Sequence, residues 1–182
     1  DHETSPIGVY GATKLEGELE VLKKLPTAII IRTSWVFSEY GNNFVKTMLR
    51  LAKDRTVLNV VADQKGKPTY ARDLARAICS IAQHSQSEAG SYSGIYHFSN
   101  DGETNWCEFA RAIFEQGRAY QLIAHHVTVN AISSAEYPTR AERPVYSVLD
   151  NSKIYKDFDV QARSWDGSLR EMLVNLGSVA DS

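Results

Sequence analysis

Helix-type and strand-type apolar patterns alternate along this chain, and the alternation limits the folds that it can adopt. Between residues 10 and 24, apolar residues recur at helical spacing until Pro26 ends the pattern. The recurring residues are Leu15, Leu19, Leu22 and Leu25. The next segment, Ala28 to Phe37, is a continuous run rich in β-branched residues, which is typical of a buried strand. A helix that leads into a buried strand predicts a mixed α/β fold.

The same alternation continues to the end of the chain. We expect further helices over residues 43–53, 73–83, 105–115, 152–156 and 167–176. We expect further strands over residues 57–61, 94–99 and 125–129, with a polar loop over residues 84–91. Asp73 stands where one of these helices would begin, and aspartate is a favourable N-cap residue.

Composition places the chain among ordinary globular proteins. Its 182 residues are 43% hydrophobic and 23% charged, which suits a single core. The net charge is −2 with both signs interspersed, so there is no basic stripe and we expect no nucleic-acid partner. No apolar run approaches the roughly 20 residues that cross a bilayer, and the first residues lack a basic segment followed by an apolar one. We therefore expect a cytoplasmic protein without a membrane partner.

Cysteine and histidine give no sign of a metal site. Cys79 and Cys107 each lie inside an apolar helical pattern, without a second ligand at a suitable spacing, so we expect two buried free thiols. His125 and His126 are adjacent, and adjacent side chains point apart on a helix or a strand. No zinc site is therefore predicted.

Tyr10 and Lys14 form a Tyr-x-x-x-Lys pair within the first expected helix. Residues four apart are neighbours on a helix surface, so the ammonium would lie beside the phenol and favour its ionised form. A phenol with its ordinary pKa near 10 exchanges protons poorly at neutral pH, and a fixed positive charge brings it closer to the working range of an acid catalyst. Tyr10 is thus a candidate acid for reduction of a ketone. The alternative is an exposed pair on a solvated helix face.

Longer motifs surround this pair. They are Ser5 to Glu18, Ala28 to Phe37, Gly41 to Val45, Asp63 to Thr69, and Gly94 to Phe98. Together these motifs resemble the extended short-chain dehydrogenase/reductase family, in register from residue 5 to residue 175. Within that family they are similar to enzymes that reduce the 4-keto group of a dTDP-linked 6-deoxysugar with NADPH or NADH.

The resemblance implies an α/β fold made of the C-terminal part of an NAD(P)-binding Rossmann-type fold and a smaller α/β substrate-binding lobe. Residues 1–62 would be the remnant of the Rossmann domain, with the catalytic helix and the following strand. Residues 63–182 would be mainly the substrate-binding lobe, with some return to the core. Gly8 and Gly11 are close together, but no strand precedes them, so the sequence lacks the glycine-rich turn that receives a pyrophosphate. We therefore expect a fragment without the N-terminal cofactor-binding half, inactive alone.

The resemblance also implies roles for individual residues. Tyr10 would be the proton donor, and Lys14 would hold the nicotinamide ribose and depress the pKa of Tyr10. Arg32 and Thr33 would lie near the cofactor. The residues implied near the nucleotide-sugar substrate are Trp35, Asn42, Asn43, Phe44 and Arg143. Some members of the family form homodimers with magnesium, but the sequence has no acidic cluster in which an ion can be placed.

Trp35 and Arg143 also have purely structural interpretations. Trp35 would offer planar apolar area to a sugar ring, or serve as core packing. Arg143 lies in Arg140 to Ser147, which resembles a family segment whose basic side chains approach the nucleotide diphosphate. Here Glu142 and Tyr146 replace an arginine and an asparagine of that segment. The identity of the substrate therefore stays open, and so does an ordinary surface ion pair for Arg143.

Two other functions stay open on the sequence. One is a non-catalytic binding relative of the same fold, such as the regulatory subunit of methionine adenosyltransferase. The other is a nucleotide-sugar epimerase or dehydratase, which uses a Tyr/Lys pair but keeps a tightly bound NAD. Retention of Tyr10, Lys14 and Trp35 favours catalysis, and the runs Arg32 to Trp35 and Asp63 to Thr69 favour the reductase.

Overall fold

The computed structural model of the chain describes residues 4–87, 92–137, 139 and 143–180. The helices are α1 (Val9–Lys24), α2 (Phe44–Leu51), α3 (Ala71–Ser87), α4 (Trp106–Ala119), α5 (Ser152–Phe158) and α6 (Trp165–Ala180), with a 3-10 helix η1 (Ser134–Glu136). The strands are β1 (Ile29–Arg32), β2 (Val36–Phe37), β3 (Val57–Val61), β4 (Lys65–Gly66), β5 (Thr69–Tyr70), β6 (Gly94–His97), β7 (Thr104–Asn105) and β8 (Thr128–Ile132). The expected α/β class is confirmed.

The strands lie in pairs. β1 is parallel to β6, β2 to β5 and β3 to β8, whereas β4 and β7 are antiparallel. At least one helix separates the two strands of each parallel pair in the sequence, as a crossover connection requires. Arg32 and His97, the last residues of β1 and β6, lie opposite each other. The carboxyl ends of these two strands therefore meet at one edge.

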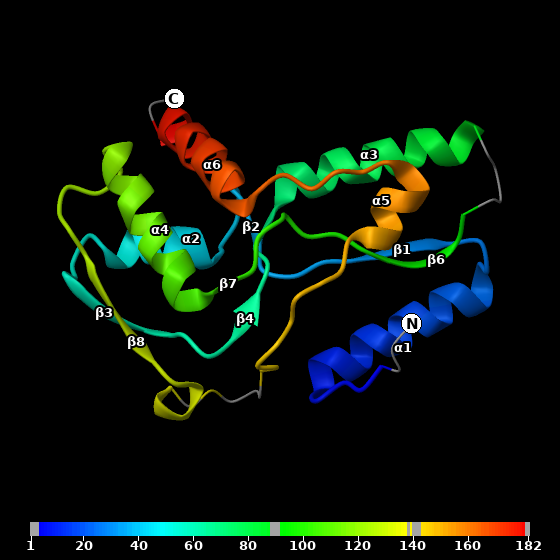
Figure 1. The fold of residues 1–182 in the computed structure, drawn as a ribbon, viewed down its shortest axis with the longest axis horizontal. Helices are drawn as coiled ribbons and strands as arrows, with labels where there is room; N and C mark the ends of the chain where they lie inside the picture. Colours follow the sequence, from blue (N-terminus) through cyan, green and yellow to red (C-terminus); the bar gives the residue numbers. More distant parts are fainter. Residues whose placement is uncertain (1–3, 88–91, 138, 140–142, 181–182) are drawn as a thin grey trace.

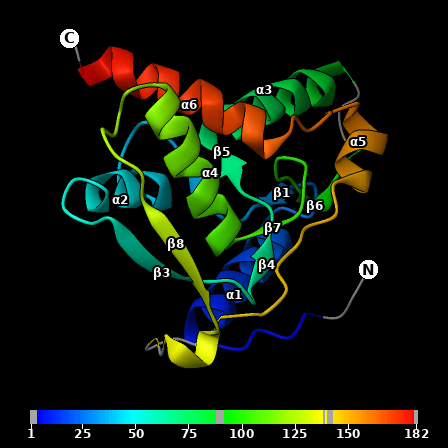
Figure 2. The same ribbon diagram turned by 60° about the vertical axis from the view of Figure 1, so that its left-hand side comes forward.

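Two apolar clusters form the core. The larger includes buried side chains of α2, α4, α6, β3 and β8, with Phe37 and Phe109 inside it. The smaller includes Tyr96 of β6 and Phe158 of α5, together with apolar residues of α3. Figure 1 shows the elements of the larger cluster on the left and those of the smaller one on the right. Helix α4 packs against α6 and against the β3 and β8 pair, which Figure 2 shows from another side.

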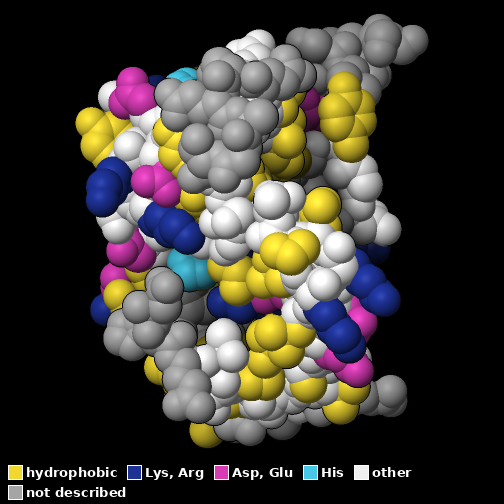
Figure 3. Space-filling model, turned by 90° about the vertical axis from the view of Figure 1, so that its right-hand side faces the viewer, with side chains coloured by type: hydrophobic (Ala, Val, Ile, Leu, Met, Phe, Trp, Pro, Cys, Tyr) yellow, Lys and Arg dark blue, Asp and Glu magenta, His cyan; other side chains and the backbone are white. Residues whose placement is uncertain are grey.

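Helix α1 lies at the margin of the fold and buries none of its side chains. Several of its apolar side chains are exposed, among them Val9 at 81% and Leu19 at 58%, whereas Leu15 and Leu22 are partly buried. Figure 3 views the molecule from the right-hand side of Figure 1, and hydrophobic side chains appear at this surface among charged ones. Amphipathic helices usually turn their apolar stripe toward a partner surface. In the part of the chain that the structure describes, that stripe of α1 is only partly covered.

The prediction of one continuous strand from Ala28 to Phe37 is wrong. The chain leaves strand geometry after β1 and resumes it as β2 at Val36. The reason is a change of neighbour, because β1 pairs with β6 whereas β2 pairs with β5. Trp35 lies in the connection with φ of 48°, a left-handed conformation that is rare for a bulky residue. Hydrophobic periodicity carries no information about such a change of neighbour.

Some smaller expectations are also wrong. Asp73 is not a helix cap, because α3 begins two residues before it and the Asp73 side chain is buried. Cys79 is exposed, although Cys107 is buried as expected. Helix α3 continues to Ser87, into the segment expected to be a loop. The last strand begins at Thr128 rather than at His125. For Asp73 the reason is contact with distant segments, because its side chain binds Asn100 and Ser168.

Candidate active site

Tyr10 and Lys14 lie on one exposed face of α1, as their spacing predicts. The Lys14 ammonium is 5.5 Å from the centroid of the Tyr10 ring, within the range of a cation–π contact. The Tyr10 side chain is 77% exposed, so its hydroxyl is accessible to a ligand. Gly8 is the N-cap of this helix, with extended backbone and no side-chain cap. The two side chains are therefore neighbours on the helix surface, and their role as an acid and its neighbouring cation stays a prediction.

Arg32 connects the end of β1 to this helix. Its Nε donates to both carboxylate oxygens of Glu18, at 2.9 and 3.1 Å, and both side chains are largely shielded from water. The hydrogen bond that Arg32 donates to the Glu18 carboxylate raises the pKa of Arg32 above its ordinary value. A guanidinium held in this bidentate way fixes the position of α1 relative to β1. Contact of Arg32 with a cofactor stays a prediction.

The carboxyl ends of β1 and β6 carry two further polar groups. The Thr33 hydroxyl is buried and has no hydrogen-bond partner in the described part of the chain. His97 is half-buried opposite Arg32, and burial together with the charge of Arg32 holds its pKa below the ordinary value. In open α/β sheets, ligands bind outside the carboxyl ends of parallel strands. An unpaired hydroxyl at such an edge fits a bound cofactor, and sequence reasoning did not single out His97.

Trp35 is stacked on a residue that the sequence motifs did not identify. Its indole and that of Trp106 have centroids 3.6 Å apart and planes that differ by 14°. Trp35 is partly buried. Its carbonyl accepts a hydrogen bond from the Thr69 backbone N–H, at 3.2 Å. Core packing therefore accounts for the stack of Trp35 on Trp106, and contact of Trp35 with a sugar stays a prediction.

Asn43 and Phe44 have structural partners. Asn43 caps α2, because its side-chain oxygen accepts from the Lys46 N–H at 3.2 Å and its amide donates to the Ser38 carbonyl at 2.6 Å. The Phe44 ring lies 4.7 Å from that of Trp106, which brings it near the Trp35 stack. Asn42 is exposed. Contact of these three residues with substrate stays a prediction.

The segment that carries Arg143 is only partly described. Arg143 is exposed and makes no ion pair with another described residue, whereas Glu142 lies outside the described residues. Tyr146 donates a hydrogen bond to Glu103 at 3.3 Å, and Glu103 pairs with Lys65 at 3.0 Å. The hydrogen bond from Lys65 lowers the pKa of Glu103. Tyr146, which departs from the family pattern, thus joins this segment to the β4 region beside Trp35.

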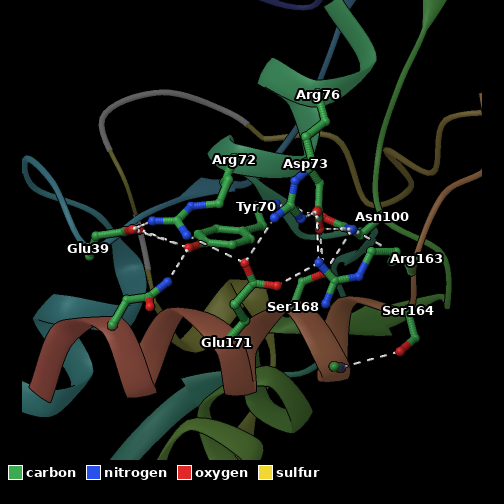
Figure 4. Close-up of polar contacts among 12 residues, drawn as sticks. Glu39, Tyr70, Arg72, Asp73, Arg76, Asn100, Arg163, Ser164, Ser168 and Glu171 are labelled. Atoms are coloured by element: carbon green, nitrogen blue, oxygen red, sulfur yellow. Dashed lines mark hydrogen bonds and ion pairs between the residues drawn. The ribbon is translucent and has the colours of Figure 1, made fainter. Parts of the chain in front are cut away.

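A buried polar network supports the loop that leads to Trp106 (Figure 4). Asp73 on α3 accepts hydrogen bonds from Ser168 at 2.5 Å, Asn100 at 2.8 Å and Arg163 at 3.1 Å. Burial opposes ionisation of Asp73, but these hydrogen bonds and the charges of Arg163 and Arg76 outweigh it, so its pKa is lowered. Asn100 is fully buried. The loop after β6 is therefore anchored to both α3 and α6.

The same figure shows a second buried carboxylate beside α6. Glu39, which is 5% exposed, accepts from the Tyr70 hydroxyl at 3.1 Å and from Arg72 at 2.8 Å. The Asn175 amide also donates to the Tyr70 hydroxyl, at 3.2 Å. Burial is the main reason that the pKa of Tyr70 is raised. This group joins the segment after β2 to α6.

The residues present fit one end of a dinucleotide cofactor. Tyr10 and Lys14 offer accessible polar groups, and Thr33 has an unpaired hydroxyl. The described residues include no strand, glycine-rich turn and helix in succession that would receive a pyrophosphate. No group of three or more His, Cys, Asp or Glu side chains in the described ranges is arranged to hold a metal ion. None of the helices in those ranges has the length and apolarity that a membrane span requires.

Comparison with known proteins gives one consistent family. The family model described as the RmlD substrate binding domain matches residues 1–178. The chain is 47% identical over 167 residues to a dTDP-4-dehydrorhamnose reductase of Aggregatibacter actinomycetemcomitans, covering 92% of this chain and 57% of that protein. It is 43% identical over 175 residues to a reductase of the same name from Sinorhizobium fredii, covering 95% of this chain and 58% of that protein.

Solved structures agree with these relatives. A dTDP-4-dehydrorhamnose reductase from Bacillus anthracis, solved in complex with NADP, matches with a TM-score of 0.85 at 38% identity, covering 96% of this chain and 58% of that one. A UDP-glucuronic acid 4-epimerase from Bacillus cereus matches with a TM-score of 0.69 at 15% identity, which shows a shared fold alone. The chain thus spans less than three fifths of the length of the reductases that it matches. The Rossmann-type class expected from the sequence is confirmed.

Proposed function

This chain belongs to the RmlD substrate binding domain family, and from that premise we propose that it is part of a reductase that converts dTDP-4-dehydro-L-rhamnose to dTDP-L-rhamnose. Relatives of the chain carry the name of this activity. The cofactor is NADPH or NADH, and a relative solved with NADP supports this class of cofactor. A cytoplasmic location and a homodimer stay predictions.

The observation that carries the proposal is the position of Lys14 over the Tyr10 ring on an exposed helix face. Reduction of a ketone requires a proton for the oxygen as a hydride reaches the carbon. Tyr10 supplies that proton from its hydroxyl to the 4-keto oxygen, and the O–H bond of the product forms as that of the phenol breaks. Lys14, whose ammonium lies 5.5 Å from the centroid of the Tyr10 ring, is the neighbouring cation of this proposed acid.

The nicotinamide supplies the hydride when it is bound. Lys14 and Thr33 are the residues of this chain that would hold its ribose end, at the edge where β1 and β6 end. Trp35 offers the accessible part of its indole to the sugar ring, since planar apolar surface suits a pyranose face. Arg143, exposed and without an ion-pair partner among the described residues, is available for the diphosphate.

We propose that the catalytic face of α1 packs against a cofactor-binding part of the complete enzyme. The exposed apolar residues of α1 support this, because an apolar stripe is normally covered. The smaller core cluster, which joins α3, β6 and α5, packs against β1 and lies in the same half of the molecule as α1 (Figure 1). The Rossmann remnant then comprises residues 1–62 and these returning elements, and the rest of 63–182 forms the substrate-binding lobe.

The test uses the complete protein that carries this chain. We expect it to oxidise NADPH or NADH only when dTDP-4-dehydro-L-rhamnose is present, and to form dTDP-L-rhamnose, measured by nicotinamide absorbance and by NMR of the product. Failure to turn over this substrate with either cofactor would contradict the proposal. Redox-neutral conversion of a nucleotide-sugar by a protein with tightly bound NAD would favour an epimerase or dehydratase instead.

The isolated 182-residue chain provides the control. We expect no turnover from it, because its described residues provide no pyrophosphate-binding turn. Measurable NADPH oxidation by the isolated chain, dependent on the sugar substrate, would show that this chain binds the cofactor by itself.

A further inference from the structure

We propose that Trp106 is a positioning residue for the nucleotide-sugar site, which acts by holding the Trp35 indole in place. The inference rests on the proposed function, because Trp35 meets the sugar only in that proposal. It adds a residue that lies 71 positions further along the chain, on another element, and outside the motifs that identified the family.

The stack between the two indoles is unusually close. Aromatic pairs in proteins usually have centroids about 4.5 to 7 Å apart, whereas Trp35 and Trp106 are at 3.6 Å and nearly parallel. Trp106 also contacts Phe44, whose ring centroid lies 4.7 Å from that of Trp106. Phe44 in turn is stacked on the buried Phe109. Trp106 is therefore supported from the core, and it can in turn fix the orientation of the Trp35 ring.

The start of α4 fixes Trp106. Trp106 is the first residue of that helix, and Asn105 caps it by accepting from the Glu108 N–H at 2.9 Å. Asn105 also pairs with Lys65 in the antiparallel ladder of β4 and β7. Trp106 thus has little freedom, since both its helix and the preceding strand hold its backbone.

The same ladder limits Trp35 from a second direction. Gly66, opposite Thr104 in β4 and β7, lies so close to Trp35 that an added β-carbon would be 2.6 Å from Cε2 of the indole. That distance is well inside van der Waals contact, so only glycine leaves room for the ring. The Trp35 indole is therefore confined by Gly66 and by Trp106, which belong to one connected unit.

The backbone of Trp35 makes this confinement necessary. A non-glycine residue with φ of 48° is held in a conformation that costs free energy and persists only where its surroundings fix it. The stack on Trp106 supplies much of that restraint. Without it, the indole would be free to leave the orientation in which its accessible part faces a ligand.

The experiment compares variants of the complete reductase. Trp106→Leu should raise KM for dTDP-4-dehydrorhamnose about tenfold, the scale expected for losing a close aromatic pair. KM for NADPH should not change, and kcat should change much less than KM. Trp106→Phe keeps a flat ring and should restore most of the substrate affinity.

Two controls separate positioning from general stability. Trp165→Leu removes an indole that packs edge-on against Phe109 in the same core cluster, and it should leave KM for the sugar unchanged. The double variant Trp35→Leu with Trp106→Leu should have the same KM as Trp35→Leu alone, because Trp106 acts through Trp35. Near- and far-ultraviolet circular dichroism should lose the signal of coupled indoles in either single variant at positions 35 and 106, but not in Trp165→Leu.

The outcomes are distinct. An unchanged KM in folded Trp106→Leu, or additive effects in the double variant, would overturn the positioning role while wild-type turnover preserves the proposed function. If Trp106→Leu does not fold, the small rise in KM that remains in Trp106→Phe decides the matter: it should disappear when Trp35→Leu is also present, and its persistence there would overturn the positioning role. Absence of wild-type turnover would contradict the proposed function itself and, with it, this role toward the sugar.

Discussion

Glu18 of α1 holds Arg32 of β1 through hydrogen bonds from two guanidinium nitrogens, since Nε donates to both carboxylate oxygens at 2.9 and 3.1 Å and Nη2 donates to Oε2 at 2.5 Å. Helix α1 buries no side chain in the described chain, so apolar packing does little to fix its position here. The ion pair is therefore a principal attachment of the helix that carries Tyr10 and Lys14. Sequence resemblance assigned Arg32 to the cofactor, and the structure gives it a structural partner as well.

Glu18→Gln should lower the free energy of unfolding by about 1 to 3 kcal/mol, because it weakens hydrogen bonds between charged, partly buried groups. In the complete protein it should also lower kcat, since Tyr10 would be less well placed. Urea denaturation and steady-state kinetics measure the two effects. Glu20→Gln is the control, because Glu20 pairs with Lys23 where both are largely exposed, and it should cost less than about 0.5 kcal/mol. Equal effects of the two variants would contradict the anchoring role.

Tyr10→Phe should reduce kcat of the complete reductase by orders of magnitude with little change in KM, because the variant loses proton donation and keeps the ring. Single-turnover kinetics with saturating substrate and NADPH measure the chemical step. Tyr155→Phe removes another exposed phenol, on α5, and should leave the rate unchanged. A near-normal rate in Tyr10→Phe would exclude Tyr10 as the acid.

The sequence predicted the parts of this site that depend on local spacing. Tyr10 and Lys14 are four residues apart on a helix, so their proximity follows from helix geometry alone. Trp106 lies against Trp35 because two strands of a short ladder pair across the chain. The sequence predicted Asp73 as a helix cap from its local position. Its actual partners, Asn100 and Ser168, are 27 and 95 residues away in the chain, so no local pattern could predict them. Spacing along the sequence does not predict tertiary contacts of this kind, and these contacts hold Trp35 and its neighbours in place.

The Asp73 network should make stability depend on acid pH. Its carboxyl has a lowered pKa in the folded chain despite the opposing effect of burial, whereas the unfolded value is about 3.9. A lowered folded pKa means that the stabilisation is complete above the unfolded pKa and is lost as pH falls through the folded pKa. Urea denaturation at pH 7 and at successively lower pH below 4 should show this loss.

Asp73→Asn should remove that part of the pH dependence and lower stability at pH 7 by about 2 to 4 kcal/mol, since Arg163 loses its opposite charge and an amide nitrogen that cannot accept replaces one of the two acceptor oxygens. Asp54→Asn, at an exposed position after α2, should change stability little at either pH. If Asp73→Asn retains the wild-type pH profile, another carboxylate is responsible for it.

The two cysteines should differ in reactivity. Cys79 is exposed and Cys107 is buried, and burial raises the pKa of the Cys107 thiol, which disfavours the reactive thiolate. One thiol per chain should therefore react rapidly with Ellman's reagent under native conditions, and both should react in denaturant. Cys79→Ser should abolish the rapid reaction. Rapid reaction of that variant would show that Cys107 is accessible in solution.

Gly66 and Gly17 should respond in opposite directions to the same substitution. A β-carbon at Gly66 would meet the Trp35 indole at 2.6 Å, whereas one at Gly17, on α1, meets nothing within 4 Å. Gly66→Ala should therefore lower the free energy of unfolding by about 1 to 3 kcal/mol through overpacking and raise KM for the sugar. Gly17→Ala should raise the free energy of unfolding by about 0.5 to 1 kcal/mol, because alanine favours a helix interior. Urea denaturation of both variants shows whether each substitution raises or lowers the free energy of unfolding.

If Gly66→Ala leaves both stability and KM unchanged, the Trp35 indole has room to move, and the confinement that we infer for it is absent.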